Sequence, residues 1–195
     1  MKITIKMTLI SDAVFGNGES IPGGEDISVL HDKNGFPYYK GGTLKGIFKE
    51  ELENYLAWTG AADPQEIVTR LLGKSGDNAG DRADKLRFYD LKLSENVRKI
   101  ILKERIDGRA LSEPEILDAF TYIRAFTALD EQGIVKEHSL RYTRCLKAGL
   151  IFYGAIDCPG KDKELVEEVL SQIKWVGTMR NRSFGRVRIE ECGGR

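Results

Sequence analysis

Three carboxylates lie in a glycine-rich stretch near the start of the chain, at Glu25, Asp26 and Asp32. Carboxylate oxygens are ligands that Mg²⁺ prefers, so a loop of this kind could position a hydrated divalent cation. Most loop carboxylates only contact solvent, and the spacing here does not by itself establish a site. The two histidines, His31 and His138, are far apart in the sequence, so a nucleophilic triad has little support.

A second candidate is the sequence GGTLKG at residues 41–46, which enters a predicted helix. Free backbone N–H groups at the start of a helix favour an anion, and Lys45 stands in the first turn. Gly42, Thr43 and Lys45 could therefore bind one phosphate. The residue order is not that of a P-loop, and GNGESI at residues 16–21 does not complete a dinucleotide-binding motif. A tight turn from a loop into a helix explains the same residues.

A third candidate is a run of arginines near the C-terminus, at Arg180, Arg182, Arg186 and Arg188. Guanidinium groups bind phosphate oxygens, and Phe184 between them could stack on a base. A loop of this composition between a helix and a strand could therefore grip a sugar–phosphate backbone. A solvated loop that leads into an edge strand is the alternative.

The composition excludes several classes of protein. The chain has 195 residues, 30 Lys and Arg against 30 Asp and Glu, and 41% hydrophobic residues, which is typical of a globular protein with one sizeable core. A net charge of zero argues against a globally basic surface but does not exclude local basic patches. Three scattered cysteines predict neither a disulfide framework nor a zinc site. With no apolar stretch near the roughly 20 residues of a membrane helix, we expect a cytoplasmic protein without a membrane partner.

Hydrophobic periodicity predicts the elements that must position these residues. Residues 2–10 alternate as a half-buried strand, and residues 43–57 have the spacing of an amphipathic helix. Between them, residues 11–42 are predicted to form a long structured loop crossed by a short strand at 27–30. A loop of this length in a compact domain is usually functional. The polar residues 74–85 are predicted to be mobile.

The remaining predicted elements are a helix at 63–72, a strand at 86–93, a helix at 112–120 opened by a capping box, hairpin strands at 122–129 and 139–144, a strand at 150–157, a helix at 161–176 ended by Gly177, and a strand at 185–190. Residues 97–106 fit a helix or a strand. The order predicts an α+β fold with a ferredoxin-like (RRM-like) antiparallel sheet, helices on one face and inserted hairpin and helical elements. We expect one domain over residues 1–195, with insertions at about 11–42 and 97–120.

These segments resemble, in order and over nearly the whole chain, the RAMP superfamily of CRISPR effector proteins, and within it the type III backbone subunits. The longest match is GFPYYKGGTLKG at residues 35–46, which resembles the family signature G-x-P-Y-I-P-G-S/T-S/T-L-K-G. Residues 23–32 resemble the family loop that carries two aspartates. Other similar segments are residues 72–73, 86–90, 123–130, 148–152 and 177–186. Lys40, Gly42 and Phe184 depart from the family pattern, and the chain is short for the family.

The resemblance implies a role that composition and spacing do not give. Such subunits stack head to tail as a filament on guide RNA, beside other type III effector subunits, and an inserted hairpin called the thumb displaces a base of the guide–target duplex. In cleaving members a loop aspartate promotes cutting of target RNA that depends on a divalent cation, Mg²⁺ or Mn²⁺. By motif position this aspartate is Asp26, and Asp32 is the second acidic residue. The residues expected to bind RNA are Gly42, Thr43, Lys45, Arg180, Arg182 and Arg186.

Several alternatives stay open. The chain could be a non-cleaving structural or capping RAMP subunit, or a guide-processing endoribonuclease of the same superfamily that uses His31 as general acid or base without a metal. It could also be a plain RNA-binding module, although no RNP-type run is visible in its strands. The thumb could lie in residues 97–119 or in the hairpin at 130–144.

Overall fold

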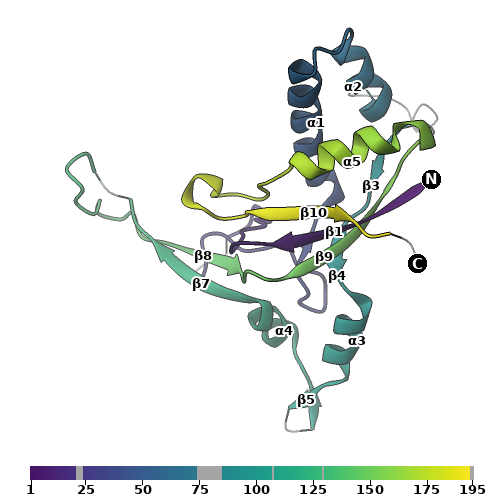
Figure 1. Ribbon diagram of the computed structural model, residues 1–195. Helices are drawn as coiled ribbons and strands as arrows, with labels where there is room; N and C mark the ends of the chain where they lie inside the picture. The colour runs from purple at the N-terminus through teal and green to yellow at the C-terminus, as the bar shows by residue number, and fades with distance from the viewer. Residues whose placement is uncertain (21–23, 74–84, 107, 129, 194–195) are drawn as a thin grey trace.

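The computed structural model describes residues 1–20, 24–73, 85–106, 108–128 and 130–193, and its fold is mixed α+β (Figure 1). The segment predicted to be mobile, residues 74–85, lies outside these residues except for Lys85. Within the described part of the chain, no helix is both long and apolar enough to cross a membrane.

The main sheet is antiparallel and has the strand order β10-β1-β9-β4-β2, with β3 paired to β9. Its strands are β1 (Lys2–Leu9), β2 (Tyr38–Tyr39), β3 (Arg87–Phe88), β4 (Leu91–Leu93), β9 (Ile151–Asp157) and β10 (Val187–Glu191). In β1, Ile3, Ile5 and Met7 are fully buried, and the polar residues between them face the other side. The strand predicted at residues 2–10 is confirmed.

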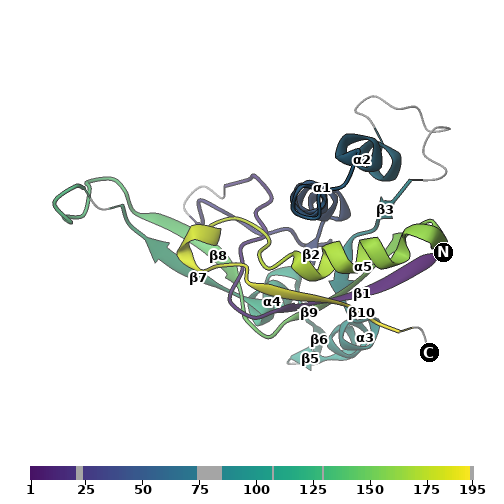
Figure 2. The same cartoon turned by 45° about the horizontal axis from the view of Figure 1, so that its top comes forward.

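Helices α1 (Gly41–Trp58), α2 (Pro64–Leu72) and α5 (Lys163–Gln172) lie on one side of the main sheet (Figure 2). The predictions at 43–57 and 63–72 are confirmed. The helix predicted at 161–176 is shorter, because it begins with the 3-10 turn η2 (Gly160–Asp162) and ends where Ile173 turns to φ −67° and ψ 107°. Ile173 and Val176 are still buried, which explains why the sequence pattern extended the helix to them.

A smaller extension leaves the sheet after β4 (Figure 1). It consists of α3 (Glu95–Lys103), the short strands β5 (Arg105–Ile106) and β6 (Arg109–Ala110), and α4 (Glu113–Phe120). Residues 97–106, which fitted either a helix or a strand, therefore contain the end of a helix followed by a strand. The capping box that opens α4 is confirmed, since the Ser112 N–H donates to Glu115 Oε2 at 2.8 Å.

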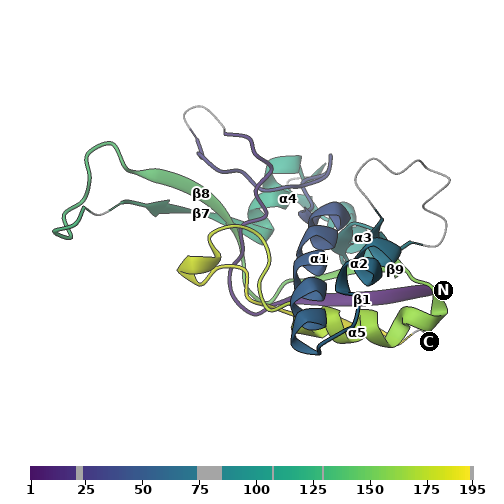
Figure 3. The same cartoon turned by 90° about the horizontal axis from the view of Figure 1, so that it is seen from above.

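Strands β7 (Thr121–Phe126) and β8 (Arg141–Leu146) form the predicted hairpin, which extends away from the main sheet (Figures 1 and 3). A second, small core of Val14, Cys145 and Phe184 lies at its base, with Ile27 and Phe126 packed against it. The N-terminal loop and the C-terminal loop therefore both contact the hairpin.

Two predicted strands are interrupted. Residues 27–30 form single bridges instead of a strand, because Ile27 pairs with Thr143 while Val29 pairs with Gly16. The strand predicted at 86–93 is broken between β3 and β4, where Asp90 Oδ1 accepts a hydrogen bond from the Gly41 N–H at 2.8 Å. This break allows the sheet to contact the first residue of α1.

Candidate functional site

Asp26 lies at the edge of the β7–β8 hairpin. Its N–H donates to the Tyr142 carbonyl at 2.7 Å, and its Oδ2 accepts from the Tyr142 N–H at 2.7 Å. The next residue continues the pairing, since the Ile27 carbonyl accepts from the Arg144 N–H at 2.9 Å. Residues 26–27 thus lie along β8 like a short additional strand. The Asp26 side chain is nevertheless exposed, so a ligand in solvent can reach it.

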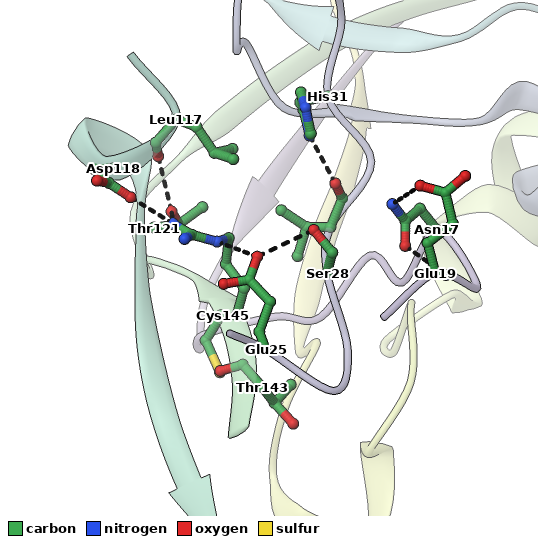
Figure 4. Close-up of polar contacts among 12 residues, drawn as sticks. Asn17, Glu19, Glu25, Ser28, His31, Leu117, Asp118, Thr121, Thr143 and Cys145 are labelled. Carbon is green, nitrogen blue, oxygen red and sulfur yellow. Dashed lines mark hydrogen bonds and ion pairs between the residues drawn. The ribbon is translucent and has the colours of Figure 1, made fainter. Parts of the chain in front are cut away.

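A buried polar network holds the backbone on both sides of Asp26 (Figure 4). Glu25 is 3% exposed, and its Oε1 accepts from Ser28 Oγ at 3.1 Å and from Arg144 Nε at 2.7 Å. Arg144 also donates to Thr121 Oγ1 at 2.9 Å and to Asp118. Burial disfavours the charge of Arg144, but its hydrogen bonds to Glu25 and Asp118 outweigh burial and raise its pKa. The network therefore fixes the loop that carries Asp26 to strand β8.

Asp32 has a different environment from Asp26. Its Oδ1 accepts from the N–H groups of Asn34 at 2.9 Å and Phe36 at 3.1 Å, and its Oδ2 pairs with Arg98 at 2.7 Å. Burial acts to raise the pKa of Asp32, but these hydrogen bonds and the charge of Arg98 lower it overall. These contacts stabilise a turn and join it to α3. They do not support the predicted catalytic role of Asp32, which stays a prediction.

His31 connects the same loop to α4. Its Nδ1 lies 2.9 Å from the Val29 carbonyl, and its Nε2 lies 3.0 Å from Glu113 Oε1. Both ring nitrogens therefore have partners within the protein, and these contacts give the imidazole a structural role. This arrangement disfavours the metal-free reaction in which His31 is a general acid or base.

The residues around Asp26 do not by themselves fit a resident cation. Within the described ranges, no group of three or more His, Cys, Asp and Glu residues is placed to hold a metal ion. A Mg²⁺ or Mn²⁺ ion beside Asp26 would need other ligands, such as water and phosphate oxygens.

The start of α1 and the C-terminal loop line one pocket of about 230 Å³. Its lining residues are Phe15, Gly16, Leu30, Tyr39, Thr43, Ile47, Gly177, Thr178 and Arg180. Thr43 and Arg180 came from separate segments of the sequence as candidate phosphate ligands, and the fold brings them together. The long loop at residues 11–42, which carries Asp26 and Asp32, contributes Gly16 and Leu30 to the same pocket.

The N-terminus of α1 lies beside this pocket, and its first N–H group already has an anionic partner, since the Gly41 N–H donates to Asp90 Oδ1 at 2.8 Å. Within the described residues, the N-cap residue Lys40 makes no side-chain capping bond and the first turn contains no acidic side chain. Gly42 and Thr43 are exposed. The first N–H groups of a helix carry partial positive charge, and at this end of α1 two of them already have acceptors: the Asp90 carboxylate accepts from the Gly41 N–H, and the Lys40 carbonyl accepts from the Thr43 N–H at 3.1 Å. Lys45, by contrast, donates from Nζ to the Leu72 carbonyl at 2.8 Å and so stabilises the C-terminal end of α2.

The fold divides the arginines that the sequence presents as one run. Arg180 lines the pocket at α1, whereas the Arg182 guanidinium lies 5.4 Å from the Phe126 ring centroid on the hairpin. Arg186 lines a different pocket of about 240 Å³ together with Lys174 and Arg188. The turn η3 (Arg180–Arg182) between these places is bounded by two residues of left-handed backbone, Met179 and Ser183.

Phe184 does not have the expected role. Its side chain is 4% exposed, and its ring packs edge-on against Phe126 with centroids 5.7 Å apart, so it cannot stack on a base. Sequence analysis also missed three residues of the site: Tyr39, Tyr142 and Arg144. Their contacts join segments distant in the chain, and no spacing in the sequence indicates them.

Comparisons with known proteins agree with the fold. A family model of the RAMP superfamily matches residues 6–188. No curated protein matches the sequence. Among solved structures, a chain of "Type III-B Cmr-beta Cryo-EM structure of the Apo state" is similar with a TM-score of 0.72 at 12% identity, over 99% of this chain and 98% of the other. A chain of "Cryo-EM structure of the Type III-B Cmr-beta bound to cognate target RNA" has a TM-score of 0.68 at 11% identity, over 98% and 97%. At such identities the likeness shows the fold alone.

Proposed function

The chain belongs to the RAMP superfamily, and from this membership we propose that it is a backbone subunit of a type III CRISPR ribonucleoprotein effector. In this proposal it binds guide RNA, stacks with copies of itself and with other effector subunits, and cleaves complementary target RNA. The similar structures are chains of type III-B complexes, one of them bound to cognate target RNA, which supports the proposal.

The topology supports the finer fold assignment. The four longest strands of the sheet are, in chain order, β1, β4, β9 and β10. In the sheet they lie in the order β10-β1-β9-β4, which is the fourth, first, third and second strand of the chain. Helix α1 follows the first of these strands and α5 follows the third. We interpret this as one ferredoxin-like domain over residues 1–195, with insertions at about 11–42 and 97–120.

Guide RNA binds, in this proposal, at the N-terminal end of α1. Gly42 and Thr43 offer N–H and hydroxyl donors to a phosphate, and Arg180 adds a guanidinium from the other wall of the same pocket. Arg182 and Arg186 lie outside this pocket, so they do not contact the phosphate bound in it. Lys45 contributes positive charge near the helix end while it bonds the Leu72 carbonyl.

The β7–β8 hairpin is the better candidate for the thumb. It extends from the body of the protein (Figure 3), and its tip exposes Ile134 by 64% and Val135 by 55%. Exposed apolar side chains on a projecting element can separate stacked bases. The extension at residues 97–119 also projects, but Asp26 is bonded to β8 and not to that extension. A base displaced at the foot of the hairpin would therefore lie near Asp26.

The proposed reaction uses the nucleophile that RNA carries. The 2′-hydroxyl of the displaced nucleotide attacks the adjacent phosphorus, and Asp26 accepts the hydroxyl proton. The bond from phosphorus to the 5′-oxygen breaks, the 5′-oxygen takes a proton from solvent, and the products are a 2′,3′-cyclic phosphate and a 5′-hydroxyl. Dependence on Mg²⁺ or Mn²⁺ belongs to the proposal, with phosphate oxygens and water supplying the ligands that the described residues do not provide.

The observation that carries this proposal is the exposed Asp26 carboxylate bonded to the edge of the hairpin. The test compares the wild-type effector, assembled with its partner subunits and guide, with one that contains Asp26→Asn. Asparagine retains an oxygen for the Tyr142 N–H, so we expect normal assembly and guide content but a loss of target cleavage of at least about 100-fold. Unchanged cleavage would refute the assignment of Asp26.

The same experiment separates the alternatives. Normal guide binding without any cleavage by the wild-type effector would identify a structural or capping subunit. Cleavage of precursor guide RNA by the isolated protein in EDTA would favour the guide-processing reaction, which the contacts of His31 disfavour.

A further inference from the structure

Tyr39 places an unpartnered hydroxyl in the protein interior. The residue is 2% exposed, and its hydroxyl oxygen has no hydrogen-bond partner within the described residues. A buried polar group without a partner costs free energy, and such groups in native proteins usually serve a function. The aromatic ring is well packed, with its centroid 4.5 Å from that of Phe15. The ring therefore has a packing role, whereas no hydrogen bond within the described residues uses the hydroxyl proton.

The buried hydroxyl lies next to the pocket at α1. Tyr39 is one of the pocket residues, and so are Gly177 and Arg180. Burial raises the pKa of the Tyr39 hydroxyl to about 12, although the Gly177 backbone amide and the charge of Arg180 act in the opposite direction. The groups that act on the hydroxyl are thus other parts of the same wall, and at neutral pH the hydroxyl carries its proton and can donate it.

The chemistry of the pocket indicates an anionic ligand. Its described lining includes the hydroxyls of Tyr39, Thr43 and Thr178 and the guanidinium of Arg180, but no carboxylate. The N-terminus of α1 adds partial positive charge, although Asp90 Oδ1 already accepts from its Gly41 N–H at 2.8 Å. The rest of the wall is apolar, formed by side chains such as Leu30 and Ile47. A volume of about 230 Å³ is below the roughly 300–1,000 Å³ of small-molecule sites, so it suits part of a nucleotide.

We propose that this pocket binds one phosphate of an RNA strand, with its ribose against the apolar wall, and that the Tyr39 hydroxyl donates a hydrogen bond to that phosphate. The inference rests on the proposed RNA-binding function and adds a residue to it.

Tyr39→Phe tests the proposal, because it removes the hydroxyl and retains the ring. Single-stranded RNA binding by the full-length protein is measured by fluorescence anisotropy, and folding by thermal denaturation without RNA. We expect RNA affinity to fall about tenfold, as for a hydrogen bond to a charged group, while the melting temperature stays the same or rises. A role in packing alone predicts unchanged affinity. Tyr55→Phe, the same change in a tyrosine of α1 that lines another pocket, is the matched control and should bind like wild type.

Two further arms make the outcome decisive. Inorganic phosphate should compete with RNA for the wild-type protein and compete less well for Tyr39→Phe; competition equal in both proteins would overturn the proposal. Thr178→Val removes another hydroxyl from the pocket and provides a second test, should Tyr39→Phe not fold. If the wild-type protein binds RNA and both variants bind it equally well, the role of the pocket is refuted but the proposed function is not. If the wild-type protein does not bind RNA, both are refuted.

Discussion

Asp26 and Tyr142 are joined by two hydrogen bonds of 2.7 Å each, one from the Asp26 N–H to the Tyr142 carbonyl and one from the Tyr142 N–H to Asp26 Oδ2. The second bond is made by the carboxylate itself, so it fixes the position of the Asp26 side chain relative to strand β8. A nucleotide placed by the hairpin is therefore placed relative to Asp26 as well. This coupling explains how one exposed carboxylate on a long loop can be positioned accurately.

The tip of the hairpin should affect the RNA target and not the fold. Ile134 and Val135 are 64% and 55% exposed, so replacing both with serine removes little packing. We expect the melting temperature of Ile134→Ser/Val135→Ser to be unchanged and target cleavage by the assembled effector to fall about tenfold or more, because apolar side chains separate stacked bases better than serine. Ile100→Ser, at a position 61% exposed on α3, is the matched control and should cleave normally. Equal losses in both variants would argue against the hairpin as thumb.

The ion pair of Glu25 and Arg144 should contribute strongly to stability. Arg144→Met leaves Glu25, which is 3% exposed, without its charged partner, and the loss of one partner of a buried pair costs about 3–5 kcal/mol. Urea denaturation would measure this change. The exposed pair of Arg109 and Glu115 offers a comparison, and Arg109→Ala should shift the urea midpoint little. Similar shifts in the two variants would mean that the buried network does not fix the loop.

Asp32 should make stability depend on acid pH. Its pKa in the folded protein lies below the ordinary value of 3.8, so Asp32 stabilises the fold when it is ionised. This contribution is lost as the pH falls below 3.8 through the folded pKa. Asp32→Asn should therefore be less stable than wild type at neutral pH, and the difference should shrink below about pH 4. Denaturant unfolding of both proteins at several pH values measures it. A difference that is constant down to pH 2 would contradict the role given to Arg98, Asn34 and Phe36.

The sequence predicted the elements best where one face packs on a single core. The alternation at residues 2–10 and the helical spacing at 43–57 reflect burial against one neighbouring layer, so periodicity was sufficient. At residues 173–176 the same spacing continues in extended backbone, because Ile173 and Val176 enter the core after α5 has ended. Hydrophobic periodicity indicates which residues are buried. It indicates a helix only where the buried residues also have helical backbone.

The candidate site was predicted in part. Resemblance placed Asp26 and the start of α1 in the site, and the fold adds that Thr43 and Arg180 share one pocket. Sequence could not show that Lys45 bonds the Leu72 carbonyl or that Asp32 pairs with Arg98, since both partners are distant in the chain. A charged residue in a motif can bond to another part of the protein or bind a ligand, and only the tertiary contacts distinguish the two roles.

Two neighbouring glycines in the signature should respond differently to alanine. A Cβ at Gly41 would lie 2.5 Å from the Phe88 carbonyl oxygen, whereas a Cβ at Gly42 would meet nothing within 4 Å. We expect Gly41→Ala to destabilise the protein by about 1–3 kcal/mol and Gly42→Ala to leave stability unchanged or slightly higher. Thermal denaturation checks both values. Gly42→Ala should still weaken RNA binding severalfold, because the added methyl group hinders the approach of a phosphate to the helix N–H groups.

Arg180 and Arg186 provide the last test, because they are the same residue type in one exposed loop but line different pockets. If the phosphate binds beside Thr43, Arg180→Ala removes one phosphate contact. The slope of log K against log salt concentration for single-stranded RNA should then decrease in magnitude by about 0.7. Arg186→Ala should retain the wild-type slope at this site. Anisotropy titrations over a range of salt concentrations measure both slopes. Equal decreases would mean that the arginines act as one continuous surface, and the division that the fold makes between them would then have no consequence for RNA.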